Sequence, residues 1–407
     1  MPPGVGTRID ERAEDLQLRV AIVSGDDIVA EDPEQLCAAL AVQGHDAALC
    51  LRRANRGSLQ AATEGNYRRI TVPVGPRKAA SPVDVLPHVG DWAATLDRIW
   101  SSEPPDVVHA YGWLGGLAAQ LAARRRLIPT VQTFLGLAAT SRDHVGGERN
   151  ERERIEPLLA RSATWVTGES SDDVDALAQL RHRRIRLSAL TCGVDAERYT
   201  PTGLTAPRNE LQRILCITPN PLWYNGVDIA IRALPKVPGA ELVVAETDAT
   251  NGDHKDARAQ LKQLASQLGV ADRVRFAGRV CADELPKFIR SADVVACTPR
   301  QPPRAATVLQ AMSSGVPVVA ASVGVLADVV LDDITGLVVA PESPVGLAVA
   351  TRRLLAQTFQ SKSMGSSGRS RAMSRFTWER IALDALNIYG SVGSQDRASM
   401  GVASTAR

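Results

Sequence analysis

The sequence predicts an α/β protein built from two doubly wound, Rossmann-like domains. Short apolar runs rich in β-branched residues alternate with longer stretches rich in alanine and leucine along most of the chain. Strands that are apolar throughout and joined by helices are typical of parallel sheets covered on both faces. The chain has 407 residues, which exceeds the usual size of one hydrophobic core and indicates about two domains.

The predicted strands fall into two sets, one in each half of the chain. In the first half they lie at 19–24, 46–51, 106–111, 129–134 and 164–168. In the second half they lie at 213–217, 240–245, 274–279, 293–297 and 317–321. Helical patterns such as PEQLCAALAVQG and GGLAAQLAARRR separate the strands. Two such sets indicate two doubly wound domains rather than one large sheet.

Composition and patterning divide the chain into six segments. A linker rich in proline, threonine and glycine separates the domains, and an amphipathic segment after the second domain predicts a last helix. The predicted segments are a disordered tail at 1–17, the first domain at 18–200, the linker at 201–212, the second domain at 213–375, the helix at 376–390 and a second disordered tail at 391–407.

Bulk composition argues against several classes of protein. Charged residues make up 23% of the chain and the net charge is +2, which gives no basic surface for a nucleic acid. No apolar run approaches the roughly 20 residues of a transmembrane helix, and the first residues have no apolar signal core. The six cysteines are scattered without a CxxC pair, as in proteins of the reduced cytoplasm. We therefore expect a cytoplasmic protein without a transmembrane segment.

The most informative stretch begins at Pro299 and reads PRQPPRAATVLQAMSSGVPVV. Its second half predicts a helix, a turn at Ser313 to Gly315, and a buried strand. The stretch resembles the donor-sugar motif of family 4 retaining glycosyltransferases, EPFGIVPLEAMASGVPVVA. In that family two glutamates, eight positions apart, hold the donor sugar and the ribose. Pro302 and Gln310 occupy these two positions here.

The resemblance extends over nearly the whole chain and is greatest to the actinobacterial branch that includes mycothiol glycosyltransferase. Matching pieces occur in the family's order and spacing, among them PPDVVHAYGWLGGLAA, RERIEPLLARSATWV, CGVDAERYTP, GVADRVRFAGRVCADELPKFIRSADVV and RFTWERIALDALNIY. The resemblance implies a GT-B fold, in which two Rossmann-like domains face a cleft and a C-terminal helix crosses back to the first domain.

The positions that bind donor phosphates in the family are changed. An arginine and a lysine usually follow the first strand of the second domain, in a pattern like GRLVPRKGVD. This chain has PNPLWYNGVD, which places Asn220 and Asn225 there. Asparagine donates hydrogen bonds but cannot offset the charge on a leaving phosphate. Where electrostatic stabilisation dominates, each lost group costs ~3 kcal/mol or more of transition-state stabilisation.

The first domain departs from the family in the same way. The HAHFW stretch appears as HAYGW, so His109 remains and Tyr111 replaces the second histidine. Leu135 replaces the histidine of the TFH motif, and the loop at 24–28 is acidic instead of glycine-rich. His109 is interpreted either as a ligand contact or as a strand-end histidine bound by backbone. Arg152 and Glu156 keep the family's RxxxE spacing, which also suits a solvent-facing i,i+4 pair.

Other candidates for donor binding follow predicted strands of the second domain. Gly278 and Arg279 lie where the family's loop meets the nucleotide base, and glycine permits close backbone approach. Arg300 and Arg304 flank the altered motif and are candidates to replace the missing Arg/Lys pair. Gln310 keeps the hydrogen-bonding capacity for ribose. Including His109, Asn220 and Asn225 described above, the sequence gives eight candidate donor-binding residues and no catalytic residue.

Two functions follow from the resemblance and from these changes. The family's reaction moves a hexosyl group from a nucleotide sugar to an alcohol acceptor, a small molecule or a lipid, with retention of configuration. It uses no metal or other cofactor. The alternative is a catalytically inactive pseudo-glycosyltransferase, a binding or scaffolding subunit with a partner glycosyltransferase. Whether the chain is an enzyme is left open by the sequence, and peripheral membrane attachment is an alternative to a purely cytoplasmic location.

Overall fold

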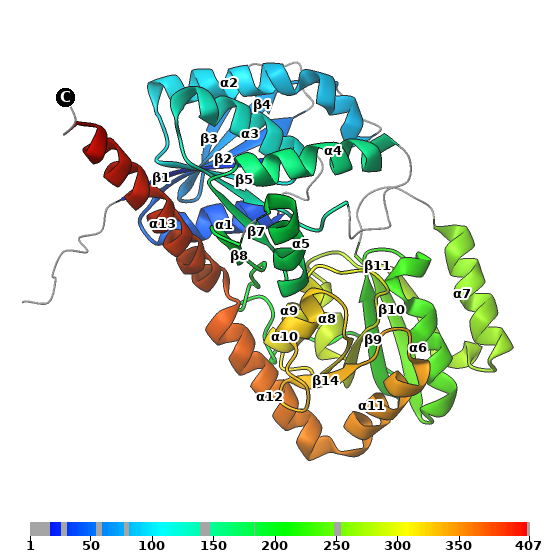
Figure 1. Cartoon of the computed structure of the whole chain (residues 1–407). Coiled ribbons are helices and arrows are strands. Elements are labelled where there is room, and N and C mark those ends of the chain that lie inside the picture. Colours follow the sequence, from blue (N-terminus) through cyan, green and yellow to red (C-terminus); the bar gives the residue numbers. More distant parts are fainter. Residues whose placement is uncertain are drawn as a thin grey trace, which may run out of the picture.

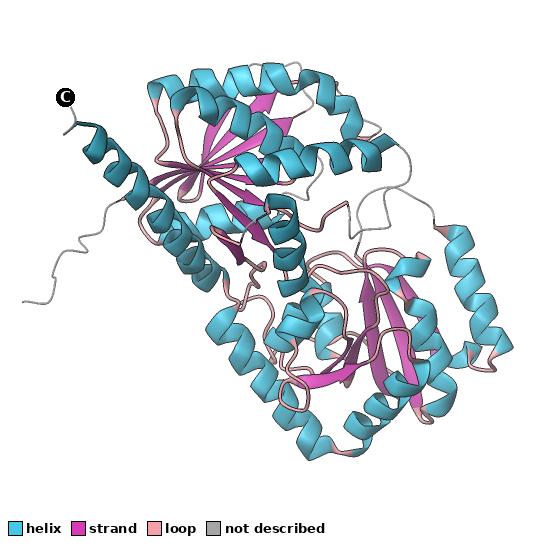
Figure 2. Cartoon of the chain, viewed as in Figure 1, coloured by secondary structure: helices cyan, strands magenta, loops and turns pink. Residues whose placement is uncertain are grey.

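The computed structural model describes residues 17–25, 31–53, 59–76, 81–138, 147–182, 184–247 and 254–404, with the backbone alone for 147–150 and 393–404. Two lobes are visible, each with a sheet between layers of helices (Figure 1 and Figure 2). All strand pairs are parallel except that between β3 and β4. The predicted α/β fold with two Rossmann-like sheets is confirmed.

The first domain contains an eight-stranded sheet with the order β3-β4-β2-β1-β5-β6-β7-β8. Its strands are β1 (Arg19–Ser24), β2 (Asp46–Arg53), β3 (Gln60–Glu64), β4 (Tyr67–Pro73), β5 (Val107–Tyr111), β6 (Thr130–Thr133), β7 (Trp165–Gly168) and β8 (Leu187–Ala189). Its helices are α1 (Glu31–Val42), α2 (Val89–Ser102), α3 (Trp113–Arg126), α4 (Gly147–Ser162), α5 (Ser171–Arg181) and the 3-10 helix η1 (Pro82–His88).

The second domain contains a six-stranded parallel sheet with the order β11-β10-β9-β12-β13-β14. Its strands are β9 (Gln212–Thr218), β10 (Ala240–Glu246), β11 (Val274–Arg279), β12 (Val294–Cys297), β13 (Val318–Ala321) and β14 (Gly336–Val339). Its helices are α6 (Val227–Ala233), α7 (Lys255–Gln267), α8 (Leu285–Arg290), α9 (Ala306–Ser313), α10 (Val325–Val329), α11 (Pro344–Ala356), α12 (Thr358–Arg375) and the 3-10 helices η2 (Trp223–Asn225), η3 (Leu234–Lys236) and η4 (Ala271–Arg273).

Local sequence explains why these elements begin and end where they do. The strand β1 is buried along almost its whole length, as its unbroken apolar run predicts. Ser170 and Asp173 form a capping box that begins α5. The turn that follows α9 has Gly315 at φ +70°, a conformation in which glycine carries no Cβ penalty. The predicted helix, turn and strand after Pro299 are therefore present as α9, Gly315 and β13.

The last helix returns to the first domain and is longer than expected. The helix α13 (Trp378–Ser404) continues past the predicted end at 390 and through most of the segment 391–407 that was predicted to be disordered. Gly390 and Gly393 are poor helix formers, but the helix continues through both. The helix packs beside α1, and the Gln43 side chain donates to the Glu379 carbonyl at 2.8 Å. Of the predicted tail at 1–17, residues 1–16 lie outside the described residues.

The buried apolar side chains of the described residues form three hydrophobic clusters. One lies on the outer side of the first sheet and another on the outer side of the second. The third is continuous between the domains and includes side chains of β1, α1, α9 and α13, such as Ile22, Leu36, Met312 and Tyr389. Apolar burial between the lobes therefore supports the polar contacts that cross from one domain to the other.

Candidate functional site

The candidate residues of the second domain follow the carboxyl ends of parallel strands, where open α/β folds bind ligands. Asn220 and Asn225 follow β9, and Gly278 and Arg279 end β11. Arg300 and Arg304 lie in the loop between β12 and α9, and Gln310 lies on α9 itself. His109, in contrast, lies inside β5 of the first domain. Strand topology thus brings seven of the eight candidates to one edge of the second sheet.

Arg304 binds two carboxylates of the first domain. Its Nε donates to Oε2 of Glu169, which follows β7, at 2.7 Å. Its Nη2 binds the carboxylate of Asp32 in the first turn of α1. The backbone N–H of Ala305 also donates to Glu169, at 3.3 Å. Arg304 keeps 37% of its side-chain surface exposed, whereas its Nε and Nη2 atoms are occupied by the two carboxylates.

The charges of this cluster depend on one another. Burial raises the pKa of the Glu169 carboxyl, and the positive charge of Arg304 limits the rise. Burial by itself lowers the pKa of Arg304, but the negative charges of Glu169 and Asp32 more than offset it, so the pKa lies well above its ordinary value. Arg304 is therefore a permanent cation, and its nearest partners are carboxylates of this chain.

Arg300 is bound within the second domain. Its guanidinium forms two hydrogen bonds to the Asp228 carboxylate, at 2.7 and 2.9 Å, and also donates to the Trp223 carbonyl at 2.7 Å. Glu342 is a second acidic partner at 3.3 Å. The fork of an arginine is well matched to such a two-point contact. Arg300 thus fixes the loop after β9 against the loop after β12, and Asp228 already neutralises it.

Asn220 and Asn225 are bonded to each other. The Asn225 amide donates to the Asn220 side-chain oxygen at 2.8 Å and to the Asn220 carbonyl at 2.9 Å. The next residue, Gly226, has φ +69°, and a Cβ there would lie 1.7 Å from the Thr298 carbonyl oxygen. Only glycine fits this close approach. The loop after β9 is therefore a closed turn in which two neutral amides occupy the positions of the family's cations.

His109 is part of the core rather than of an open site. The side chain is fully buried, with Nδ1 2.6 Å from the Tyr389 hydroxyl and Nε2 2.6 Å from Thr133 Oγ1. Burial lowers the pKa of His109 to about 3, so the ring is neutral. It stacks on Tyr111 at a centroid distance of 4.7 Å. The structure agrees better with the second interpretation, a histidine whose hydrogen bonds are made within the protein, although its partners are side chains instead of backbone.

The remaining candidates differ in their surroundings. Gly278 has φ +70° and nothing within 4 Å of the place of a Cβ, so a ligand has room to approach the backbone. Arg279 beside it is exposed. Gln310 is half-buried on α9, and its carbonyl accepts from the Ser314 N–H. Pro302 packs so closely on Gly324 that a Cβ at Gly324 would lie 2.8 Å away.

The structure also places the family-matching residues of the first domain. Arg152 and Glu156 form an ion pair at 2.7 Å that is almost wholly buried, with Glu156 accepting from the Ala138 N–H at 2.8 Å. The solvent-facing interpretation of this pair is therefore wrong, because the pair anchors the segment after β6. Most of the acidic loop at 24–28 lies outside the described residues.

Sequence reasoning missed the acidic partners of the arginines. Asp32 and Glu169 neutralise Arg304, and Asp228 neutralises Arg300. Asp32 and Glu169 are remote from Arg304 in the sequence, and Asp228 lies in the helix α6. Glu169 had one available signal, since it directly follows a predicted strand of the first domain, at the carboxyl end where open α/β folds bind ligands. Asp32 had none beyond its place at a helix start, where an acid suits the helix dipole.

No described helix has the length and hydropathy that a membrane crossing requires. Within the described ranges, no cluster of three His, Cys, Asp or Glu side chains is arranged to hold a metal ion.

Comparison with known proteins identifies the family. Residues 29–193 match the glycosyl transferase 4-like domain, and residues 206–371 match the glycosyl transferases group 1 domain. The D-inositol 3-phosphate glycosyltransferase of Stackebrandtia nassauensis is 29% identical over 340 residues, which cover 78% of this chain and 76% of that protein.

Solved structures show the same fold. Sucrose-phosphate synthase from Thermosynechococcus elongatus superposes with a TM-score of 0.76 at 19% identity, over 93% of this chain and all of that one. Anabaena HepE, solved in complex with UDP, superposes with a TM-score of 0.70 at 20% identity, over 92% of this chain and all of that one. With one family domain matched in each lobe, the chain belongs to the group 1, family 4-type glycosyltransferases of the GT-B fold.

Proposed function

We infer that the protein transfers a hexosyl group from a nucleotide sugar to an alcohol acceptor, with retention of the anomeric configuration. Membership of the family supports the reaction class. The observation that carries the proposal is Arg304, a partly exposed cation beside the first domain at the carboxyl end of β12. A guanidinium there can bind diphosphate oxygens as a fork and offset the charge of the leaving group.

Other candidates take supporting roles in this proposal. Gly278 and Arg279 would lie beside the nucleotide base, since nothing lies within 4 Å of the place of a Cβ at Gly278. Gln310 would donate to the ribose from α9. In this proposal an arginine, and not a metal ion, offsets the charge of the leaving diphosphate. D-inositol 3-phosphate is the first acceptor to test, because the name of the Stackebrandtia relative contains it.

A second candidate function is a binding or scaffolding subunit without turnover, which assembles with an active glycosyltransferase. The bonded pair of Asn220 and Asn225 favours it, since neutral amides replace both cations of the loop. Loss of one preorganised electrostatic group costs on the order of 3 kcal/mol, or roughly a hundredfold in rate. Two such losses would leave donor binding with little catalysis.

Calorimetric titration with UDP, GDP, ADP and their glucose forms tests the first step. We expect micromolar binding of one nucleotide, followed by acceptor-dependent release of that nucleotide in an assay with D-inositol 3-phosphate and other alcohols. Binding without turnover would support the scaffolding function. Absence of heat from all six ligands would contradict donor binding and with it the transferase proposal.

Restoring the cations separates the two functions. An Asn220→Arg/Asn225→Lys variant should hydrolyse or transfer its donor at least about tenfold faster, because one fork and one point charge again face the diphosphate. Gln263→Lys, on the exposed side of α7, is the control for added charge on the same domain. Equal turnover of the parent and the double variant would show that Asn220 and Asn225 do not limit the reaction.

A further inference from the structure

Arg304 connects the domains through charged groups, and its two partners belong to separate elements of the first domain. Glu169 follows β7 and Asp32 begins α1, whereas Arg304 precedes α9 of the second domain. We call Asp32, Glu169 and Arg304 the ion triad. Because both carboxylates lie in one domain and the guanidinium in the other, the triad can form only when the two domains are in contact.

Burial makes the triad strongly dependent on its arginine. Glu169 is only 3% exposed, and a buried carboxylate is costly unless it is paired and hydrogen-bonded. Arg304 and the Ala305 N–H, both from the second domain, provide charge and hydrogen bonds to this carboxylate. Without Arg304 the closed arrangement would contain an unpaired buried charge. The domains would then gain by separating, because Glu169 would regain water.

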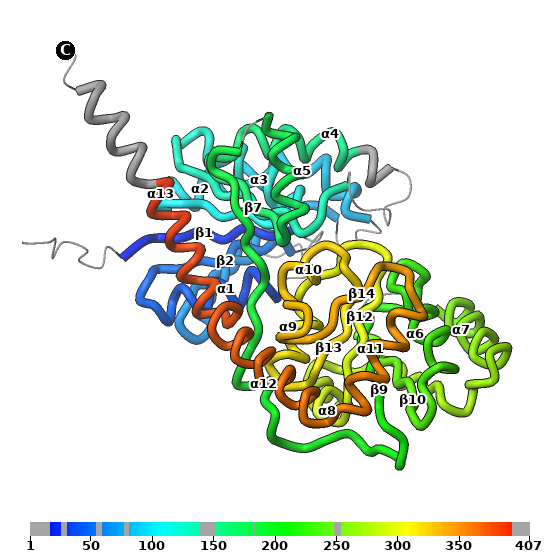
Figure 3. The backbone as a smooth tube through the Cα atoms, turned by 60° about the horizontal axis from the view of Figure 1, so that its bottom comes forward, coloured from blue at the N-terminus to red at the C-terminus, as the bar shows by residue number. Residues whose placement is uncertain are grey.

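The backbone connections between the domains resemble a hinge. The chain crosses from one domain to the other twice, and the crossing segments run side by side in Figure 3. The Val194 N–H donates to the Phe376 carbonyl at 2.8 Å, and Val194 pairs with Thr377. Few backbone positions therefore need to change when the lobes rotate, as in hinge motions of other two-domain proteins.

A second polar contact between the domains is weaker than the triad. The Asp328 carboxylate of α10 accepts from the Ser171 N–H at 2.7 Å and from the Ser171 hydroxyl at 2.8 Å. This contact caps α5 and is exposed to solvent, where such interactions contribute little. Arg198 also pairs with Asp283 at 2.7 Å and the Ser313 hydroxyl donates to the Tyr199 carbonyl at 2.7 Å, but Arg198 and Tyr199 lie at the end of the first domain, where the chain crosses. Away from this crossing, closure therefore depends mainly on the ion triad and on the apolar cluster shared by the domains.

We propose that the ion triad is a closure latch, which holds the two domains together before any ligand binds. The carboxylates of Glu169 and Asp32 act as internal anions on Arg304. A diphosphate that enters between the domains must compete with them, a consequence that rests on the proposed function. The closed arrangement therefore favours the empty protein, and tight ligand binding requires release of the latch.

Small-angle X-ray scattering of the full chain without nucleotide tests the latch. Arg304→Ala removes the cation, and Glu169→Gln keeps the size and one hydrogen-bonding oxygen of the carboxylate. Arg300→Ala is the matched control, since Arg300 lies in the same loop but pairs with Asp228 of its own domain. We expect a larger radius of gyration in both latch variants than in the parent and the control. An unchanged radius in both latch variants, or an equal increase in the control, would overturn the proposal.

Titration with UDP tests the competition separately. Glu169→Gln should bind UDP about tenfold more tightly than the parent, because one competing charge on Arg304 is gone. Equal or weaker affinity in this variant would overturn the competition. If UDP bound neither protein, GDP and ADP would be titrated in the same way. Failure of all three to bind would contradict the proposed donor binding, whereas the scattering measurement, made without nucleotide, would still decide the latch.

Discussion

At the scale of single residues, the chemistry-bearing side chains of this protein are mostly bound to other side chains. Arg304 pairs with Glu169 and Asp32, and Arg300 pairs with Asp228. Asn220 is bonded to Asn225 in the loop where the family has cations. A donor would therefore exchange existing contacts for new ones, so the net gain from each contact is smaller than from a side chain that faces water alone.

His109 gives a prediction at this scale. Its pKa is about 3 in the folded protein, against 6.5 for an ordinary histidine. Below pH 6.5 the unfolded chain therefore binds a proton that the folded protein excludes. The contribution of neutral His109 to the free energy of unfolding is fully present above pH 6.5. It falls with decreasing pH by about 1.4 kcal/mol per pH unit. Between pH 7.5 and 5 this histidine should cost about 2 kcal/mol of unfolding free energy.

Urea unfolding at both pH values checks this expectation. The control is His109→Gln, which keeps a hydrogen-bonding side chain but does not titrate. Between the two pH values, the free energy of unfolding of the parent should fall by about 2 kcal/mol more than that of the variant. Equal losses would show that His109 is not held neutral by burial.

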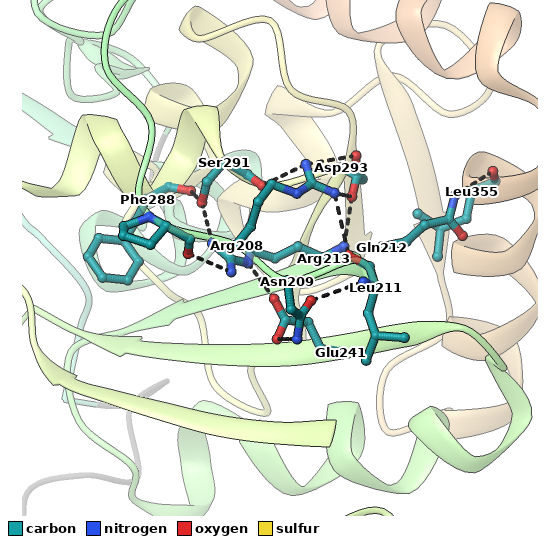
Figure 4. Close-up of polar contacts among 11 residues, drawn as sticks. Arg208, Asn209, Leu211, Gln212, Arg213, Glu241, Phe288, Ser291, Asp293 and Leu355 are labelled. Carbon is teal, nitrogen blue, oxygen red and sulfur yellow. Dashed lines mark hydrogen bonds and ion pairs between the residues drawn. The ribbon is translucent and has the colours of Figure 1, made fainter. Parts of the chain in front are cut away.

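At the scale of elements, a polar network anchors the first strand of the second domain (Figure 4). Arg213 at the start of β9 is 1% exposed and pairs with Glu241 of β10 at 2.7 Å. It also donates to the Ser291 hydroxyl at 2.8 Å and to the Pro207 carbonyl at 2.9 Å. The network ties the linker, β9, β10 and the end of α8 together at the strand ends opposite to the candidate site.

Removing one partner of this network should destabilise the second domain strongly. Arg213→Met leaves Glu241 buried without its cation, at a cost of about 3–5 kcal/mol. Hydrogen exchange of the β9 and β10 amides measures the loss of stability in the second domain separately from the first. Arg208→Met is the control, because Arg208 pairs with Asp293 at the surface and should cost less than about 1 kcal/mol. Similar losses in both variants would contradict a special role for the buried pair.

At the scale of the whole molecule, the last helix packs back onto the first domain. The polypeptide leaves the first domain after β8, builds the second domain and returns through α12 and α13 (Figure 1). Trp378 at the start of α13 is buried against Gly193, where a Cβ would lie 2.5 Å from the indole. The returning helix is therefore fitted to the crossing segment and belongs to the first domain by its packing.

Truncation of this tryptophan should loosen the first domain more than the second. Trp378→Ala removes a large buried side chain, at a cost of about 3–5 kcal/mol. Amide exchange should become faster in α13 and α1 together, while β9 and β10 keep their protection. Leu383→Ala, at an exposed position of the same helix, should change exchange little. Faster exchange in both domains of the Trp378 variant would show that the helix stabilises them jointly.

Much of the fold was accessible from the sequence because its signals are local. Apolar runs predicted the core strands, and the helix, Gly315 turn and strand after Pro299 followed from adjacent residues. The antiparallel pair of β3 and β4 was missed, since β3 is exposed along its length and has no apolar run. The end of α13 was placed too early, because the amphipathic pattern that predicted the helix ends near Tyr389, whereas the helix continues beyond it.

The sequence by itself determined the two-domain α/β architecture, the family and the positions of the altered donor residues, because strand patterns and motif spacing are local properties. Only the tertiary structure decided what those residues bind. Arg304 meets Asp32, 272 residues away, and His109 meets Tyr389, 280 residues away. Such pairs form when strand ends and helix starts of different segments are brought together. No local pattern encodes the partner of a charge, so the neutralised arginines and the buried histidine appear only in the folded molecule.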